Sequence, residues 1–395
     1  MGENEMKKLI IELSDERPIT PSSLFLVGQL LGKSRFIKKC NAMKVDGKRS
    51  QSQIKNGDIL LSYIGLLCQG KTAYEDIRKM LEDPGYYEQA LGITSTIPSA
   101  ETLRQRMDDI GSSLRRNILD VNVEMFHTYN MEPTPISEEF VPVDLDVTPL
   151  DNSKTYKEGV LYNYKGYFGY APMMAYIGAE GFLVNTELRE KSQRCQYNTP
   201  AFLSETLNYS HQLTEKQLFV RMNSGNDSAE NLGILIEDGS RFIVKNNLRR
   251  GESKQEWLDK VKECCKDICH PRDGKTIYVG SLWKAVNYTD VEGNSKTVTT
   301  RIVYKVIERT MDKNGQLLIL PDIECNTFWT NLDWNDDAVI KGYHAHGECE
   351  QYHSEIKTDM DVEWFPSGKF ETNELVLELT ILAYNILRMI GQASL

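Results

Sequence analysis

The spacing of apolar residues in the first third of the chain predicts α-helices. Between residues 56 and 82, the apolar side chains from Ile59 to Leu67 recur close to the helical period. Ser99 stands where a helix N-cap residue is expected, and the predicted helix after it carries Arg104 and Arg106 on its early turns. Basic first turns are typical of helix-turn-helix DNA-binding modules, although packed helices with no DNA partner show the same pattern.

From residue 140 the pattern changes to one of strands and helices. Residues 140–147 alternate, so Asp144 and Asp146 share one face of a predicted strand while valines and a leucine share the other. A hairpin is predicted over residues 170–189. It is followed by a helix (200–210), a strand (217–222), a helix (228–238) and a strand (241–245). This order predicts a mixed sheet with helical crossovers.

A third pattern, over residues 275–329, consists of strand-like segments. Asn314 and Gly315 form a strong hairpin signal within it, and we interpret the whole as a β-rich insertion. After the insertion a set of polar residues recurs at intervals of three, four and seven, which keeps its members near one face of a helix. The set is Tyr343, His346, Glu350 and Lys357.

Composition narrows the class of protein. The 395 residues include 46 Lys and Arg against 57 Asp and Glu, which gives a net charge of −11. No apolar stretch is long enough for a membrane span, and the first residues do not form a secretion signal, so we expect a cytoplasmic protein with no membrane partner. Residues 33–55 depart from the acidic balance, because they hold eight basic residues and one aspartate. Such a run can contact phosphates.

The order of these features resembles that of the DDE transposases of bacterial insertion sequences. In that family one strand carries the first Asp, a later strand ends at the second, and a helix after a β insertion carries Y-x-x-R-x-x-x-E-x-x-x-x-x-x-K. The corresponding segments here are residues 140–153, the strand that ends at Met222-Asn223, and the helix from Tyr343 to Lys357. Residues 169–176 and 366–370 extend the resemblance, which covers the chain from Phe140 onward.

The resemblance implies a ribonuclease-H-like fold and metal-dependent phosphodiester chemistry. Two Mg²⁺ ions, for which Mn²⁺ can substitute, would activate the nucleophile and stabilise the leaving oxygen. The positions that match the family's catalytic, metal-binding residues are Asp146, Asn223 and Glu350, with Asp144 as the other candidate for the first ligand. The positions implied to contact DNA are Tyr343, His346 and Lys357, and the N-terminal helix adds Arg104 and Arg106.

Two positions depart from the family pattern. Asn223 stands where the family has Asp, so the site loses an ionised ligand, and His346 replaces an arginine that can hold a phosphate with two hydrogen bonds. Asn223 has three interpretations: decay in a defunct element, a substitution that keeps the shape but stops cleavage, or a change tolerated because Asp227 supplies the carboxylate. We favour decay, because His346 and the short C-terminus point the same way.

These features predict four parts of the chain. They are a helical DNA-binding region (1–132), a ribonuclease-H-like core in two pieces (133–250 and 336–395) and a mostly β insertion (251–335). The expected function is cleavage and strand transfer at the ends of an insertion sequence. A DNA-binding remnant without this activity is the main alternative, and a metal-dependent nuclease unconnected with transposition is another. The expected partners are double-stranded DNA at transposon ends and at the target, bound by a homodimer at the nucleoid.

Overall fold

A large sheet forms the centre of the molecule. The computed structural model describes residues 23–43, 52–136, 139–162, 165–189, 198–248, 252–290 and 292–393. Nine strands pair in the order β6-β5-β1-β7-β8-β12-β11-β10-β9, and a separate small sheet has the order β2-β4-β3. The strands of the first part are β1 (Phe140–Val147), β2 (Leu150–Asp151), β3 (Leu161–Tyr162), β4 (Phe168–Tyr170), β5 (Met173–Ile177), β6 (Phe182–Glu187), β7 (Gln217–Met222) and β8 (Arg241–Lys245).

The first five strands of the sheet have the ribonuclease-H-like arrangement. Strand β1 pairs antiparallel with β5 and parallel with β7, β5 pairs antiparallel with β6, and β7 pairs parallel with β8. The parallel connections pass through α8 (Thr199–Leu213) and α9 (Ala229–Asp238). The strands predicted at residues 140–147, 217–222 and 241–245 are confirmed with the same bounds.

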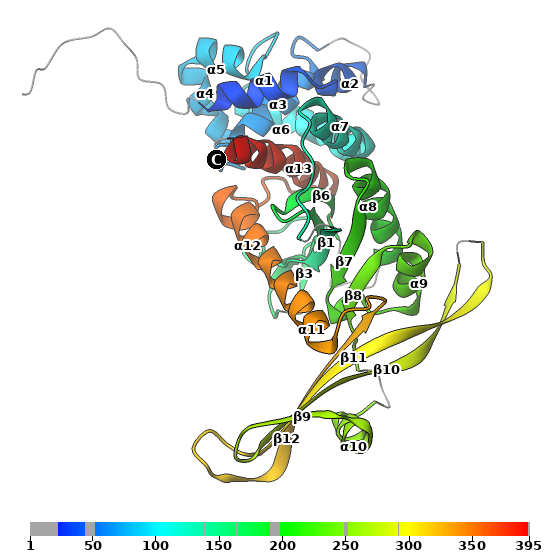
Figure 1. Ribbon diagram of the computed structural model, residues 1–395. Helices are drawn as coiled ribbons and strands as arrows, with labels where there is room; N and C mark the ends of the chain where they lie inside the picture. The colour runs from blue at the N-terminus through cyan, green and yellow to red at the C-terminus, as the bar shows by residue number, and fades with distance from the viewer. Residues whose placement is uncertain are drawn as a thin grey trace, which may run out of the picture.

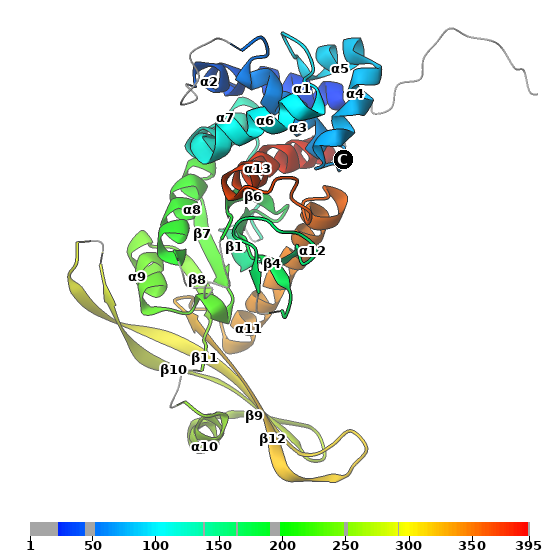
Figure 2. The ribbon, with the colours of Figure 1, turned by 180° about the vertical axis from the view of Figure 1, so that it is seen from behind.

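Helices cover both faces of this sheet. It lies between α8 and α9 on one side and α11 (Asp336–His344) and α12 (Cys349–Ser354) on the other, as Figures 1 and 2 show from opposite directions. Residues 141–146 of β1 are therefore buried on both faces. The aspartates of β1 do lie on one face, but that face is a packed interface, and their carboxylates need partners inside the protein.

The polar helix predicted after the insertion is irregular. A 3-10 turn, Ala345–Glu348, joins α11 to α12, and a π-helical turn, Glu355–Asp359, follows α12. Each change of winding shifts the side chains that follow it around the helix axis. A strict 3.6-residue period therefore does not give the direction of every side chain from Tyr343 to Lys357.

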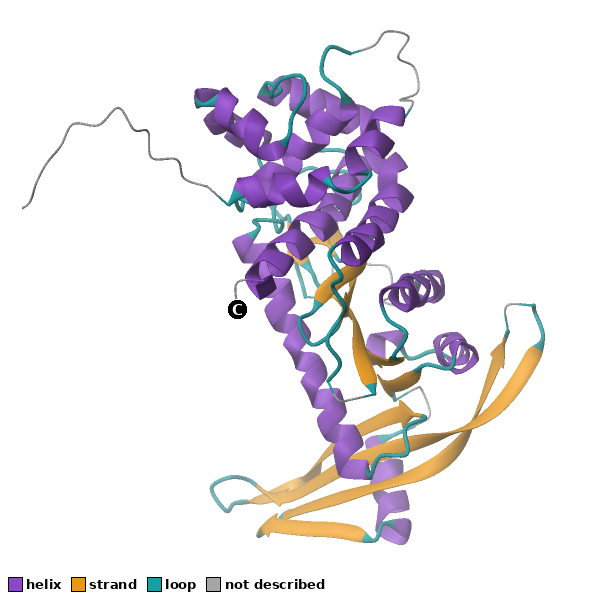
Figure 3. Ribbon diagram, turned by 45° about the horizontal axis from the view of Figure 1, so that its top comes forward, coloured by secondary structure: helices purple, strands orange, loops and turns teal. Residues whose placement is uncertain are grey.

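The insertion is a long arm that continues the sheet away from the core (Figure 3). It consists of α10 (Lys254–Cys264), β9 (Asp267–Arg272), β10 (Lys275–Thr289), β11 (Ser295–Met311) and β12 (Leu317–Thr330). Its last strand joins the core by pairing Phe328 with Lys245 of β8. The turn predicted at Asn314-Gly315 is confirmed, with Gly315 at a φ of 84°. Helix α10 begins at a capping box formed by Ser253 and Glu256.

The N-terminal helices pack against the last helix of the chain, α13 (Phe370–Ala393), at the end opposite the arm (Figure 1). They share one continuous apolar core with the sheet. These helices are α1 (Leu24–Gly32), α2 (Phe36–Ala42), α3 (Asn56–Leu67), α4 (Arg78–Glu82), α5 (Pro84–Leu91), α6 (Ala100–Ile110) and α7 (Arg115–Thr128), with 3-10 turns at Tyr74–Ile77 and Gly111–Leu114. The Ser99 cap is confirmed, since its side chain accepts a hydrogen bond from the Thr102 N–H.

A buried carboxyl in α13 makes the stability of this layer depend on pH. Burial raises the pKa of Glu378 to about 9, and the charge of Arg115, 3.7 Å away, only partly opposes the shift. Because the folded state holds this proton up to a higher pH than the unfolded state, the free energy of unfolding falls as pH rises between about 4.5 and about 9.

We expect Glu378→Gln to stabilise the protein at alkaline pH. The gain in free energy of unfolding should reach roughly 2 kcal/mol at about pH 8 and shrink towards about pH 5, because the amide carries no titrating proton. Urea unfolding at the two pH values measures it. The control is Glu371→Gln, at an exposed position of the same helix. An unchanged pH dependence in Glu378→Gln would contradict the prediction.

Candidate functional site

The ends of two adjacent strands bring Asp146 and Asn223 into contact. Since β1 and β7 are parallel with Leu145 opposite Met222, the residues that follow in each strand emerge side by side at the same sheet edge. The Asp146 carboxylate accepts hydrogen bonds from the Val147 N–H, at 2.7 Å, and from the Asn223 side-chain amide. The Asn223 Oδ1 atom is buried and has no hydrogen-bond partner among the described residues.

A histidine that the sequence analysis missed completes the surroundings of Asp146. The Nε2 atom of His353, on α12, lies 3.4 Å from the second carboxylate oxygen of Asp146, and its Nδ1 atom lies 2.9 Å from the Tyr176 hydroxyl. Burial raises the pKa of Asp146, but His353, His346 and the Val147 N–H together outweigh burial and hold the pKa below its ordinary value. The signal available in the sequence was the spacing of seven residues between His346 and His353, which places both on one side of a helix.

Asp144, the other candidate for the first metal ligand, lies in a buried ion pair. Both of its carboxylate oxygens accept hydrogen bonds from the Arg221 guanidinium at 2.6 Å, and His346 Nδ1 lies 2.8 Å from one of them. All three side chains are buried. The Arg221 charge therefore balances that of Asp144 inside the sheet, and we favour Asp146 as the first-ligand candidate. His346 likewise lies against Asp144 instead of at an exposed DNA-binding surface.

The rest of the signature helix lies alongside this pair of strands. Glu350 is exposed on α12, one turn before His353, which contacts Asp146. Lys357 is half-buried, and burial lowers its pKa, while the charges of Glu363, Glu350 and Asp146 act in the opposite direction. Lys357 therefore interacts electrostatically with Glu350 and Asp146, the two predicted acidic ligands. Tyr343 packs its ring on Phe328 with a centroid separation of 4.8 Å.

Comparison with known proteins identifies the family. The family model described as transposase DDE domain, group 1, matches residues 22–395. The chain belongs to this family. No curated protein matches the chain. Among solved structures, the cryo-EM structure of a piggyBac transposase synaptic complex with hairpin DNA is similar, with a TM-score of 0.44 and 10% identity over 94% of this chain and 74% of that one.

DDE transposases use divalent metal ions, and the oxygens around Asp146 fit one. The Asp146 carboxylate and the unpartnered Asn223 Oδ1 lie at the same sheet edge, and Glu350 is exposed on α12, the helix whose His353 contacts Asp146. These are hard oxygen ligands of the kind Mg²⁺ prefers. A second group, Asp144, His346 and Cys349, has ligand atoms within 4.8 Å of one another. There the Arg221 charge already neutralises the carboxylate, so that group is less suited to a cation.

Asp227 does not lie free to replace the missing carboxylate. The residue is buried beyond the 3-10 turn Ser224–Asn226, and its Oδ2 atom accepts a hydrogen bond from the Asn247 N–H at 2.9 Å. It thereby ties the loop after β7 to the segment that follows β8. The interpretation in which Asp227 compensates for Asn223 is not supported by this geometry.

The two arginines predicted to contact DNA have different surroundings. Arg106 is buried, and its guanidinium donates to Ser52, the Ile54 carbonyl and Asn56, so it holds the segment before α3 and does not face outward. Arg104 is exposed and pairs with Glu101 at 2.6 Å.

Within the basic run, Arg35 and Lys39 lie 3.3 and 3.9 Å from acidic residues of α7. Lys44, Lys48 and Arg49 lie outside the described residues.

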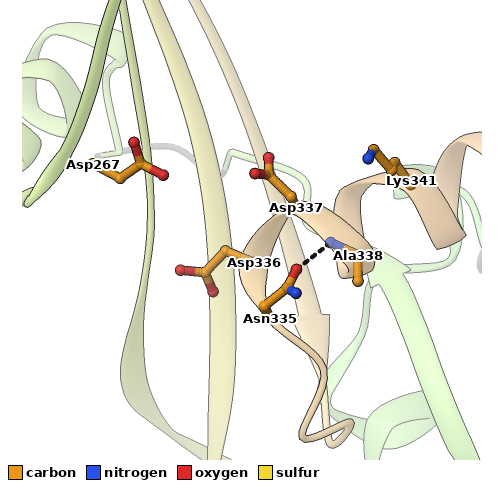
Figure 4. Close-up of a pocket in the computed structure, with 6 residues that line it drawn as sticks. All are labelled: Asp267, Asn335, Asp336, Asp337, Ala338 and Lys341. Carbon is orange, nitrogen blue, oxygen red and sulfur yellow. Dashed lines mark hydrogen bonds between the residues drawn. The ribbon is translucent and has the colours of Figure 1, made fainter.

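A pocket lies away from Asp146, at the start of α11 (Figure 4). It has a volume of about 430 Å³ and is lined by Asp267, Asn335, Asp336, Asp337, Ala338 and Lys341. The Asn335 side chain caps α11 there, and Asp336 pairs with Arg301 of the arm. This acidic pocket joins the arm to the core.

Among the described helices, none is both long and apolar enough to cross a membrane.

Proposed function

We propose that this chain is the transposase of an insertion sequence and that its metal-dependent strand cleavage is weakened at residue 223. The observation that carries the proposal is the direct contact between the Asn223 amide and the Asp146 carboxylate. Two carboxylates at these positions would repel each other unless a cation lay between them. The amide removes this repulsion, and with it one negative charge that would attract the ion.

Each residue then has a role in phosphodiester cleavage. Asp146, Asn223 and Glu350 would hold a divalent ion, which when bound activates the attacking oxygen and stabilises the leaving one. His353 orients the Asp146 carboxylate, and the Tyr176 hydroxyl fixes His353 in turn. Lys357, beside Glu350, would hold a phosphate next to the scissile bond.

Binding and cutting of DNA that carries the inverted repeats flanking this gene test the proposal. We expect the parent chain to bind this DNA more tightly than an unrelated duplex and to nick it slowly with Mg²⁺ or Mn²⁺. Asp146→Ala should remove the residual nicking and leave DNA binding within about threefold, because most of the binding energy comes from phosphate contacts elsewhere.

The outcomes separate the candidate functions. Specific binding without nicking at any metal concentration, even in Asn223→Asp, would favour a DNA-binding remnant, which the Asn223 contact also accommodates. Equal nicking of any duplex without preference for the repeats would favour a general nuclease. Nicking that survives Asp146→Ala would show that the site has been misplaced.

A further inference from the structure

The segment from residue 152 to residue 170, directly after the β1 aspartates, has an unusual composition. It contains six aromatic residues and three lysines but a single acidic residue, whereas the whole chain carries a net charge of −11. The small sheet β2-β4-β3 is built from it and the two residues before it. Aromatic rings and lysines together are typical of surfaces that bind single-stranded nucleic acid.

The segment is fixed to the end of the signature region. Tyr170 is buried and packs edge-on against Phe365 with a centroid separation of 5.6 Å. Asn152 donates a hydrogen bond to the Glu363 carbonyl at 3.0 Å and accepts one from Lys157 at 2.9 Å. These contacts hold the small sheet beside α12, where Figure 2 shows β4.

Three aromatic rings of this segment point away from the core. Tyr162 and Phe168 lie opposite each other in the β3–β4 pair, with ring centroids 5.4 Å apart, and are 57% and 49% exposed. Tyr156, in the loop between β2 and β3, is fully exposed. We call Tyr162 and Phe168 the aromatic platform. Large rings left in water are unfavourable, and clustered ones mark an interaction surface.

The aromatic platform follows the Asp146 site closely in the chain, because β2, the first strand of the small sheet, begins at Leu150, four residues after Asp146. Lys165 lies between Tyr162 and Phe168 in the chain. Like burial, its positive charge lowers the pKa of Lys357, so the two lysine side chains lie near each other. The same Lys357 interacts electrostatically with Glu350 and Asp146. A strand of DNA whose scissile phosphate lay at Asp146 could therefore run past these lysines to the rings.

We propose that the aromatic platform binds unpaired nucleotides at the DNA end held in the Asp146 site. This inference rests on the proposed function. Bases within a duplex already stack on their neighbours, so only unpaired ones offer a face to Tyr162 or Phe168. Exposed lysines of the same segment, Lys154 and Lys165, complement the phosphates of that strand. A protein partner fits less well, because the core of a protein interface is depleted in lysine.

Fluorescence anisotropy with two labelled probes tests the inference. Both are duplexes of the element end, one blunt and one with a 3′ overhang of about six thymidines. We expect the parent chain to bind the overhang at least about tenfold more tightly than the blunt duplex. Tyr162→Ala combined with Phe168→Ala should abolish this preference without changing the blunt affinity, and Tyr162→Phe should retain it because stacking needs the ring and not the hydroxyl.

Two further variants make the result decisive. Tyr162→Leu with Phe168→Leu keeps apolar bulk without rings and serves if the alanine pair does not fold. Trp283→Ala removes a ring that is 70% exposed on the arm and should leave the preference intact. The proposal is wrong if the double alanine or the double leucine variant prefers the overhang as strongly as the parent does. It is also wrong if these variants change only the oligomeric state. Failure of the parent to bind either probe would instead reject the proposed function.

Discussion

Replacing Asn223 by Asp is expected to raise Mg²⁺-dependent cleavage of end DNA by roughly 100-fold or more. The substitution is nearly isosteric and restores a charged oxygen ligand at the position where the Asn223 amide now contacts the Asp146 carboxylate. Asp146 and the carboxylate introduced at position 223 would then both be charged ligands able to hold the ion. Time courses of nicking at several Mg²⁺ concentrations, with parent and variant side by side, measure the effect.

The matched control is Asn314→Asp, which adds the same charge at an exposed turn of the arm. It should cleave like the parent. The double variant, Asn223→Asp with Asp146→Asn, should be inactive, because residue 223 then carries the carboxylate but residue 146 carries the amide, so the site again has one charge too few. Equal cleavage by parent and Asn223→Asp would mean that residue 223 does not contribute to the ion site.

Removing one partner of the buried Asp144–Arg221 pair is expected to cost about 3–5 kcal/mol of the free energy of unfolding. Burial raises the pKa of Asp144, but His346 and Arg221 outweigh it and keep the carboxyl ionised inside the sheet. Asp144→Leu leaves the Arg221 guanidinium buried without its counter-charge, whereas Asp144→Leu with Arg221→Met removes both charges. Urea unfolding should therefore show the double variant recovering most of the loss.

The comparison is Glu324→Ala, which removes one carboxylate partner of Arg309 on the surface of the arm. That change should cost less than about 1 kcal/mol, because water solvates the remaining charge. If Asp144→Leu is as stable as Glu324→Ala but no longer binds metal, Asp144 is a ligand and our assignment of its role is wrong.

The sequence predicts the core strands well because each one is short and bounded by clear turn signals. Strands β1, β7 and β8 begin and end at the predicted residues. The meeting of Asp146 with Asn223 also follows, since consecutive parallel strands end at the same edge of the sheet. The family resemblance supplied the order of the elements.

Other features depend on register and packing that no single segment reveals. Asp144 pairs with Arg221 because the two residues are opposite each other in β1 and β7, a cross-strand register that neither strand's pattern contains. His346 and His353 become partners of the β1 aspartates only once α11 and α12 cover that face. In the arm, residues 317–320 are exposed although all are apolar, so their pattern carried no information about a buried face.

Direct binding of Mn²⁺ to the protein tests the central claim, that residues 146 and 223 form the ion site and that Asn223 weakens it. Electron paramagnetic resonance of free Mn²⁺, titrated with parent, Asn223→Asp and Asn314→Asp chains, gives the dissociation constants without DNA. We expect at least about tenfold tighter binding by Asn223→Asp alone, lost again when Asp146→Asn is added. Equal affinities of the parent and Asn223→Asp would contradict it.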